Sequence, residues 1–419
     1  MGIVAEYLSQ ADKLLIRGLN EALKREVDCK IETLTLSAQD AVSLFIDAQD
    51  LPHLKQLHLV NWNDQDLIDV ATTLTALSLT PFELVLAGQP GQHAPNLQCL
   101  ATLNLSGLAL YNLRITPETS NALCAADFAI AVVFPATGLM RIEDVDAIIR
   151  IPTLSVLRIG FSPVSDTIAE ALRRHPSLTA FACRRINGYQ LRLIMGNPQL
   201  QSFSVDTIED GSDADFIALA THPALRSLAL SAVEHAQDLM TLSSSTPIAK
   251  LQLGLKVGAI ASLPYLANMP ALRELTLSGI FFEDRIATLT ASDIEAICRK
   301  PLAALEFRFF EMRGPNFVMA ASAHASTLRF QCWPGTSDLV IDDHVIDAIA
   351  DNHAVSSLSL TGGHIVEGGA ARLAAIPQLD TLTLDLTSAA ETAETVRRAW
   401  TDAAKPLVNL KCVIGAPRH

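Results

Sequence analysis

The stretch Pro152-Thr153-Leu154-Ser155-Val156-Leu157-Arg158-Ile159 carries the pattern that decides the fold. It places an apolar residue, two variable residues, a leucine, one variable residue and a second apolar residue in that order, with proline two positions before the first apolar residue. Alternation of Leu157 and Ile159 with variable residues predicts a short strand that buries one of its faces.

The same pattern returns along the chain, and from Leu157 onward its apolar pairs lie 22 to 30 residues apart, as between Phe181 and Phe203 and between Leu328 and Leu358. Clear copies have their strand pair at Leu57/Leu59, Leu157/Ile159, Phe181/Cys183, Phe203/Val205, Leu228/Leu230, Leu275/Leu277 and Leu382/Leu384. Looser copies are centred on Leu34/Leu36, Leu84/Leu86, Leu103/Leu105, Leu251/Leu253, Leu305/Phe307, Leu328/Phe330, Leu358/Leu360 and Leu410/Cys412, with an obscure copy near Ala131/Val133. The chain therefore contains roughly sixteen irregular repeats.

Between these strands the apolar residues follow a helical period. The predicted helices cover residues 64–74, 142–150, 166–174, 213–221, 292–299, 342–350 and 367–375. A side-chain oxygen at the start of a helix can accept a hydrogen bond from an unpaired first-turn amide. The residues suited to this capping role are Asp64, Asp166, Asp213, Ser292 and Asp342.

A single strand and helix cannot bury their apolar sides alone, so neighbouring repeats must stack into one continuous core. We therefore predict an α/β solenoid, a horseshoe with a parallel β-sheet on its concave face and helices on its convex face. The amphipathic residues 1–30 are predicted to form an N-terminal helical cap, residues 31–415 the repeat domain and residues 416–419 a tail.

These repeats resemble the leucine-rich-repeat superfamily over about nine tenths of the chain. The asparagine that this family usually carries beyond its second strand leucine is mostly absent, since Trp62, Ile208, Val233 and Ile280 stand there or nearby. That departure favours the helix-rich subclass that resembles ribonuclease inhibitor.

A second resemblance lies in Glu367-Gly368-Gly369-Ala370-Ala371-Arg372-Leu373-Ala374. This stretch looks like the glycine- and alanine-containing helix in leucine-rich-repeat type III effectors of plant-pathogenic bacteria. The resemblance implies delivery into a host cell and capture of a host protein there.

The composition restricts the class of partner and the location of the protein. The 419 residues have a formal net charge of −14, whereas proteins that bind nucleic acid gather lysine and arginine, so we expect no nucleic-acid partner. No apolar run reaches the roughly 18 residues of a membrane span, and residues 1–30 lack the features of a secretory signal peptide. We expect a cytoplasmic protein, or one delivered into a host cell, without insertion into a membrane.

No sequence motif of a known catalytic, cofactor or metal site is present. The seven cysteines are far apart and never form a Cys-x-x-Cys pair, so we interpret them as reduced thiols, several of them at core positions of strands. His53, His175, His222 and His353 stand just before strands, which indicates a recurrent turn position. The sequence thus predicts a chain without catalytic residues, cofactor or metal.

Strand alternation also predicts which residues face a partner, because the variable residues beside the strand leucines point away from the core. Small residues occupy positions 180–231 of this face, and Arg158 and Arg184 flank them. Farther along, arginine lies among aromatic residues, a combination enriched in binding hot spots. The predicted partner-binding residues are Arg158, Arg184, Glu306, Arg308, Arg329, Gln331 and Trp333. The alternative is a solvated sheet face that simply tolerates such residues.

These features favour a non-catalytic scaffold that binds a protein, and the second resemblance implies a bacterial effector that captures a host protein through its concave face. One alternative is the substrate-recognition part of an effector enzyme such as a ubiquitin ligase. The other is an inhibitor of a basic enzyme, which the charge of −14 would attract.

Overall fold

The computed structural model describes residues 32–47, 53–75, 81–89, 92–94, 97–134, 142–160, 164–245, 247–280, 288–310, 314–331, 340–362, 364–386, 393–403, 405–406 and 410–414. The chain divides into two compact units, Met1–Leu200 (unit 1) and Gln201–His419 (unit 2). The predicted cap of residues 1–30 and the predicted tail of residues 416–419 lie outside the described residues.

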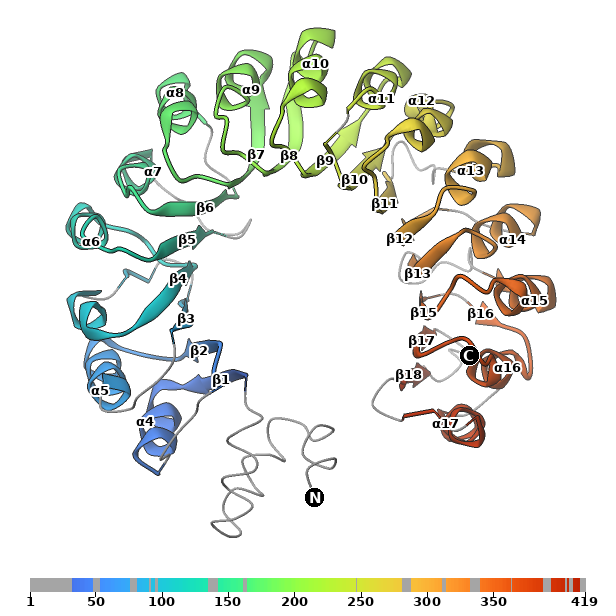
Figure 1. The fold of residues 1–419 in the computed structure, drawn as a ribbon, viewed down its shortest axis with the longest axis horizontal. Helices are drawn as coiled ribbons and strands as arrows, with labels where there is room; N and C mark the ends of the chain where they lie inside the picture. The colour runs from blue at the N-terminus through green and yellow to red at the C-terminus, as the bar shows by residue number, and fades with distance from the viewer. Residues whose placement is uncertain are drawn as a thin grey trace. The chain divides into compact units, whose positions relative to one another are not determined.

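Unit 1 alternates strands with helices from its first described residues to its end (Figure 1). Its elements are β1 (Thr33–Ser37), α4 (Ala38–Asp47), β2 (Gln56–Val60), α5 (Asp64–Thr75), β3 (Phe82–Ala87), η1 (Leu97–Thr102), β4 (Leu105–Tyr111), α6 (Pro117–Leu123), β5 (Ala129–Val133), α7 (Ile142–Ile149), β6 (Leu154–Ile159), α8 (Asp166–Arg174), β7 (Ala180–Asn187) and α9 (Gly188–Ile194).

The strands of unit 1 pair in parallel and in chain order, each with the next. Their leucine pairs are in register, so that Leu34 lies beside Leu57 and Leu57 beside Leu84. These side chains are buried between the sheet and the helices. Within the unit the strands line the inner side of an arc and the helices its outer side (Figure 1). One sheet face therefore carries the core, and the opposite face, here called the open face, has no helix on it among the residues that the structure describes.

Unit 2 repeats this alternation with two additional short strands. Its elements are β8 (Ser202–Glu209), α10 (Asp213–Thr221), β9 (Ser227–Val233), α11 (Ala236–Leu242), β10 (Lys250–Leu255), α12 (Val257–Ile260), η2 (Leu263–Asn268), β11 (Glu274–Gly279), α13 (Ala291–Cys298), β12 (Leu302–Arg308), α14 (Pro315–Ala321), β13 (Ala325–Gln331), β14 (Val340–Ile341), α15 (Asp343–Asp351), β15 (Ser357–Thr361), β16 (His364–Ile365), α16 (Gly369–Ala375), β17 (Thr381–Leu386), α17 (Ala393–Asp402) and β18 (Leu410–Ile414).

The long strands of unit 2 also pair in parallel in chain order, from β8 through β13 to β15, β17 and β18. The short strands β14 and β16 pair with each other in a separate two-stranded sheet. The prediction of a parallel sheet with helices on one of its faces is confirmed in both units, and each unit is an α/β solenoid.

Two predicted strand registers are wrong. At β4 the core pair is Leu108/Leu110, which lies beside Leu84/Leu86, and not Leu103/Leu105. The three-residue spacing of Leu97, Leu100 and Leu103 belongs to the 3₁₀ helix η1 and the turn after it, where all three side chains are buried.

At β5 the core pair is Ile130/Val132, beside Leu108/Leu110, and not Ala131/Val133. All five residues of this strand are apolar, so the sequence contains no alternation that would define the register. A shift of one residue moves every side chain to the other face of the sheet. Ala131 and Val133 therefore belong to the open face.

Only one of the five predicted helix caps is confirmed, since Asp342 caps α15 and accepts a hydrogen bond from the Val345 amide at 3.0 Å. Elsewhere the cap stands one or two residues earlier in the chain. Ser165, Ser212 and Thr290 are the N-caps of α8, α10 and α13, and Asn63 exchanges capping hydrogen bonds with Asp66 at the start of α5. The residue directly after Asn63, Ser165 or Ser212 is an aspartate in the first turn, where the helix dipole favours a negative charge.

The recurrent turn position before the strands is occupied by His175, Asn197, His222 and Asn352, all of which are buried. The Asn197 carboxamide donates to Leu172 O at 2.8 Å and to His175 O at 3.1 Å, and it accepts from the Gln199 amide at 2.9 Å. Asn352 makes the same three types of bond, to Ala321, Ala323 and Ala354. These side chains bind the backbone of the preceding repeat to the next turn.

His175 and His222 confirm the predicted turn position, but His53 and His353 do not occupy it. His53 stands one residue before Leu54, and His353 is the exposed residue that follows Asn352. At His175, Nε2 lies 3.0 Å from Ile151 O, and Nδ1 accepts from the Ser177 amide at 3.4 Å. The ring is thus held by the same backbone groups that asparagine binds in other repeats.

Because His175 is buried, desolvation lowers its pKa below the ordinary value of 6.5, although backbone hydrogen bonds oppose the shift. The unfolded chain then takes up a proton at a higher pH than the folded chain. We expect the free energy of unfolding to fall as the pH drops below 6.5, by at most about 1.4 kcal/mol per pH unit from this group. Urea denaturation at neutral pH and about one unit below 6.5 measures the loss.

The matched variant is His175→Asn, because asparagine fills this position in the next repeat and does not titrate. This variant should lose less stability than the wild type between the two pH values. Equal losses in both proteins would exclude His175 as a source of the pH dependence.

Candidate protein-binding surface

The open face of unit 2 is polar over its whole length. Rows of side chains run across the strands at positions that are in register, and each row consists mainly of serine, threonine, glutamine and charged residues. The row through the middle of the face contains Ser204, Ala229, Gln252, Thr276, Glu306, Arg329, Ser359 and Thr383. Such a face offers many hydrogen-bonding groups to an extended partner.

The predicted residues Glu306, Arg308, Arg329 and Gln331 come together on this face. Glu306 of β12 lies beside Arg329 of β13, and Arg308 lies beside Gln331. Under them the Phe307 and Phe330 rings are buried and stack with their centroids 5.8 Å apart. We refer to these four residues as the arginine cluster. The fifth predicted residue of this region, Trp333, lies outside the described residues.

Within the arginine cluster, Arg308 is already engaged by a carboxylate. Arg308 Nε donates to Glu306 Oε1 at 2.7 Å and Nη2 donates to Oε2 at 3.0 Å. The Thr276 hydroxyl donates to the same carboxylate at 3.3 Å. The two-pronged pair fixes the guanidinium plane and leaves the Arg308 side chain 33% exposed. The cluster therefore presents Arg308 in one preferred orientation.

Arg329 differs from Arg308 because its side chain is exposed and forms no hydrogen bond or ion pair with any residue in the described part of the chain. A partner carboxylate that bound Arg329 would not have to displace an existing bond. Arg329 is consequently the group of the cluster best placed to gain a new interaction on association.

The open face of unit 1 has a different character. Arg158 of β6 lies between Val133 of β5 and Ala182 of β7, and its side chain is exposed. Arg184, also exposed, follows two residues after Ala182 on β7. The structure thus places both predicted arginines of unit 1 on neighbouring strands, beside a set of apolar residues.

Several of those apolar residues were not predicted from the sequence to lie on the open face. Strand β4 contributes Tyr111 and the buried Ala109 to the open face, and β5 contributes Ala131 and Val133. The available signal was the three-residue spacing of leucines over residues 97–103, which separates η1 from the strand that follows.

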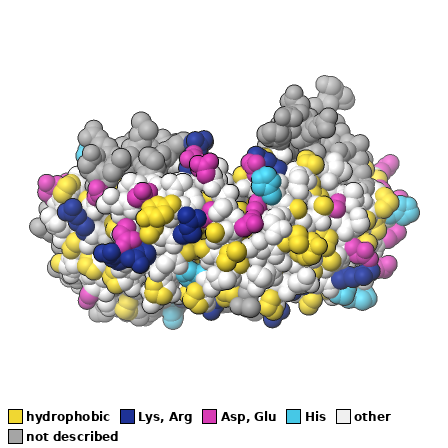
Figure 2. Space-filling view, turned by 90° about the horizontal axis from the view of Figure 1, so that it is seen from above, with side chains coloured by type: hydrophobic (Ala, Val, Ile, Leu, Met, Phe, Trp, Pro, Cys, Tyr) yellow, Lys and Arg dark blue, Asp and Glu magenta, His cyan; other side chains and the backbone are white. Residues whose placement is uncertain are grey.

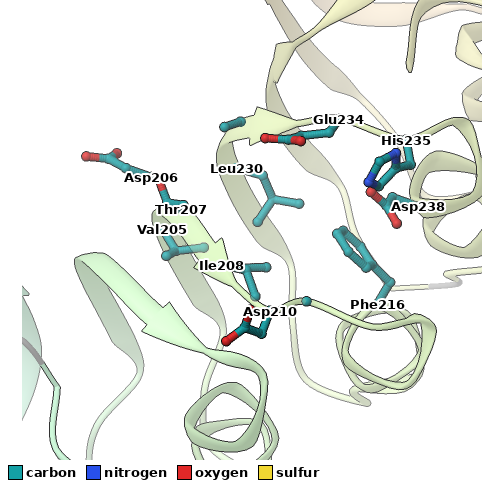
Figure 3. Close-up of a pocket in the computed structure, with 12 residues that line it drawn as sticks. Val205, Asp206, Thr207, Ile208, Asp210, Phe216, Leu230, Glu234, His235 and Asp238 are labelled. Atoms are coloured by element: carbon teal, nitrogen blue, oxygen red, sulfur yellow. The ribbon is translucent and has the colours of Figure 1, made fainter. Parts of the chain in front are cut away.

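Unit 2 also contains a pocket of about 330 Å³ at the carboxyl ends of β8 and β9 (Figure 3). Phe216 and Leu230 form apolar walls, and Asp206, Glu234 and Asp238 supply carboxylates. The Ser231 hydroxyl donates to Asp206 at 2.9 Å, and Lys256 binds Glu234. Burial raises the pKa of Asp238, while a backbone hydrogen bond from His235 opposes the shift. These three carboxylates are therefore already bonded within the chain.

The outer helices present a mixture of charged and hydrophobic side chains (Figure 2). In unit 2 the exposed large hydrophobic residues of this side are Ile217, Met240, Val257 and Tyr265. Among the described residues, no group of three His, Cys, Asp or Glu side chains could hold a metal ion. No helix in the same part of the chain is both long and apolar enough to cross a membrane.

Cys99, Cys124, Cys183 and Cys298 form no disulfide bond within the described part of the chain. Cys183 is buried at a core position of β7, as predicted for strand cysteines, whereas Cys298 is buried on α13. Burial raises the pKa of Cys298 to about 12, so this thiol stays protonated at neutral pH. Cys124 is half-buried and its thiol donates to Arg150 O at 3.5 Å.

No protein-family model matches the chain, and no curated protein matches it. Among solved structures it is similar to an internalin (inlF) from Listeria monocytogenes, with 13% identity over 90% of this chain and 95% of that one at a TM-score of 0.41. It is also similar to TLR13 in a complex with ssRNA13, with 15% identity over 87% of this chain and 57% of that one at a TM-score of 0.38. Its repeated leucine pairs, parallel strands and one-sided helices nevertheless define the fold directly: each of the two units is a solenoid of leucine-rich repeats.

Proposed function

We propose that the chain is a non-catalytic scaffold that binds a protein through the open face of its sheet. The observation that carries the proposal is the arginine cluster, in which an oriented Arg308 lies on the strand next to Arg329, which is exposed and has no partner among the described residues. Arginine is enriched among the few residues that dominate binding energies. A rigid sheet face also limits the ordering that association requires.

We further propose that the partner is a protein of a host cell into which this chain is delivered. The resemblance of residues 367–374 to the helix of type III effectors supports this role, and most of that stretch lies in α16. The net charge of −14 favours a protein over a nucleic acid as partner.

The test compares capture of a protein from a nuclease-treated host lysate by immobilised chains. The double variant Arg308→Glu and Arg329→Glu should bind the captured protein roughly 10- to 100-fold more weakly than the wild type, because both hot-spot cations are reversed. Arg329→Glu alone, which breaks no bond inside the described chain, should account for a large part of the loss.

The control is the double variant Arg397→Glu and Arg398→Glu on α17, which changes the net charge by the same amount at a different surface. That variant should retain the partner, and both it and Arg329→Glu, which break no hydrogen bond of the arginine cluster, should keep the urea midpoint of the wild type. If both double variants bound the partner equally weakly, net charge alone would explain the loss of affinity. If Arg308→Glu with Arg329→Glu bound the partner as tightly as the wild type, the arginine cluster would not be the binding site.

A further inference from the structure

Strands β4 to β7 of unit 1 carry a continuous set of apolar side chains on the open face, which we call the apolar strip. Its outer row contains Tyr111, Val133 and Ala182, and its inner row contains Ala131, Val156 and Ala180. Tyr111 is 40% exposed, and the other five side chains are half-buried. The corresponding rows of unit 2 are mainly polar, so the strip is a local property of unit 1.

The charge of the strip opposes that of the chain. The charged residues of the four strands are Arg158, Arg184 and Arg185, all of them exposed, and none is acidic. The whole chain has a net charge of −14. A cationic and apolar surface on an acidic protein attracts an anionic segment and disfavours a second copy of the same chain.

Arg158 lies within the outer row, because it pairs with Val133 on one side and with Ala182 on the other. Neighbouring strands are only about 4.8 Å apart, so a group bound at Arg158 also contacts apolar side chains. Its guanidinium forms no hydrogen bond or ion pair to residues that the structure describes. A bound partner would exclude water there, which strengthens a two-pronged bond to a carboxylate.

We infer that the apolar strip binds a protein segment that presents aromatic or aliphatic side chains beside a carboxylate, with the carboxylate held by Arg158. The inference deepens the proposed function, on which it rests, by assigning the chemistry of the partner in unit 1. The positive charge of the strip favours such a segment over a basic one. The apolar rows favour it over a segment that carries only acidic side chains.

The experiment selects binders for the full chain from a random dodecapeptide library displayed on phage. The wild type should enrich peptides that combine Trp, Phe, Leu or Ile with Asp or Glu. Arg158→Glu should instead enrich peptides that combine apolar residues with Lys or Arg. Val133→Glu, which introduces a carboxylate directly beside Arg158, should bind the wild-type peptides at least roughly tenfold more weakly.

The matched control is Arg150→Glu, which makes the same charge change after the end of α7 and should enrich the same peptides as the wild type. Far-UV circular dichroism and urea midpoints confirm that each variant is folded. Three results would each overturn the inference. The selected peptides could bind Arg158→Glu as tightly as the wild type, the wild type could enrich basic peptides, or Val133→Glu could abolish a self-association of the wild type. Such a result would leave the arginine cluster standing if Arg308→Glu with Arg329→Glu still loses its captured protein.

Discussion

Replacement of Phe330 by alanine should destabilise unit 2 by about 3–5 kcal/mol. Phe330 is a core residue of β13 with 2% of its surface exposed. Its ring packs edge-on against Phe317 of α14 with centroids 4.9 Å apart and stacks on Phe307 of β12 at 5.8 Å. The variant would lose the buried ring and leave a cavity among three elements of neighbouring repeats. Urea denaturation followed by circular dichroism measures the change.

The control for this variant is Tyr265→Ala on η2, where the ring is 42% exposed. Loss of that aromatic side chain should cost less than about 1 kcal/mol, as is usual at the surface. Because each repeat contacts only its neighbours, Phe330→Ala should also accelerate hydrogen exchange first in β12, β13 and α14. Equal losses of stability in the two variants would contradict the assigned role of Phe330 in the core.

Where the sequence contained alternation, the strands could be predicted to the residue. Leu157 and Ile159 alternate with Val156 and Arg158, and β6 has the predicted core pair. Helices of nine residues with a polar outer side were also predictable, since the bounds of α8 and α10 agree with the prediction. Among the seven-residue helices α16 was predicted, whereas α9 and α14 were missed, because two turns contain few positions that can show a helical period.

The arginine cluster could be predicted because it depends only on register and alternation. Once Phe307 and Phe330 are assigned to the core, Glu306 and Arg329 must share the opposite face. The apolar strip was missed, since β5 is apolar on both faces and Leu103 and Leu105, between η1 and β4, have the spacing of a strand pair. A strand that is apolar on both faces has no alternation that distinguishes its core face from its open face.

Replacement of Asn197 by leucine should destabilise unit 1 by about 2–4 kcal/mol, although the two side chains have similar shapes. Asn197 is 1% exposed, and its carboxamide binds Leu172 O, His175 O and the Gln199 amide. Leucine would leave the two buried carbonyl groups and the part-buried Gln199 amide without their partner. Each loss costs more than the original bond contributed, because neither water nor another donor can replace it. Urea denaturation with hydrogen exchange over α8 and α9 measures the effect.

Two variants separate this cause from a general effect of removing asparagine. Asn121→Leu changes an exposed residue of α6 and should shift the stability of unit 1 by less than about 0.5 kcal/mol. Asn197→His introduces histidine, the residue type that occupies the same turn position in the preceding repeat. There the His175 ring nitrogens bind the same kinds of backbone group. Asn197→His should retain more stability than Asn197→Leu. Equal stability of Asn197→Leu and Asn121→Leu would contradict the claim that the hydrogen bonds of the buried turn residues hold neighbouring repeats together.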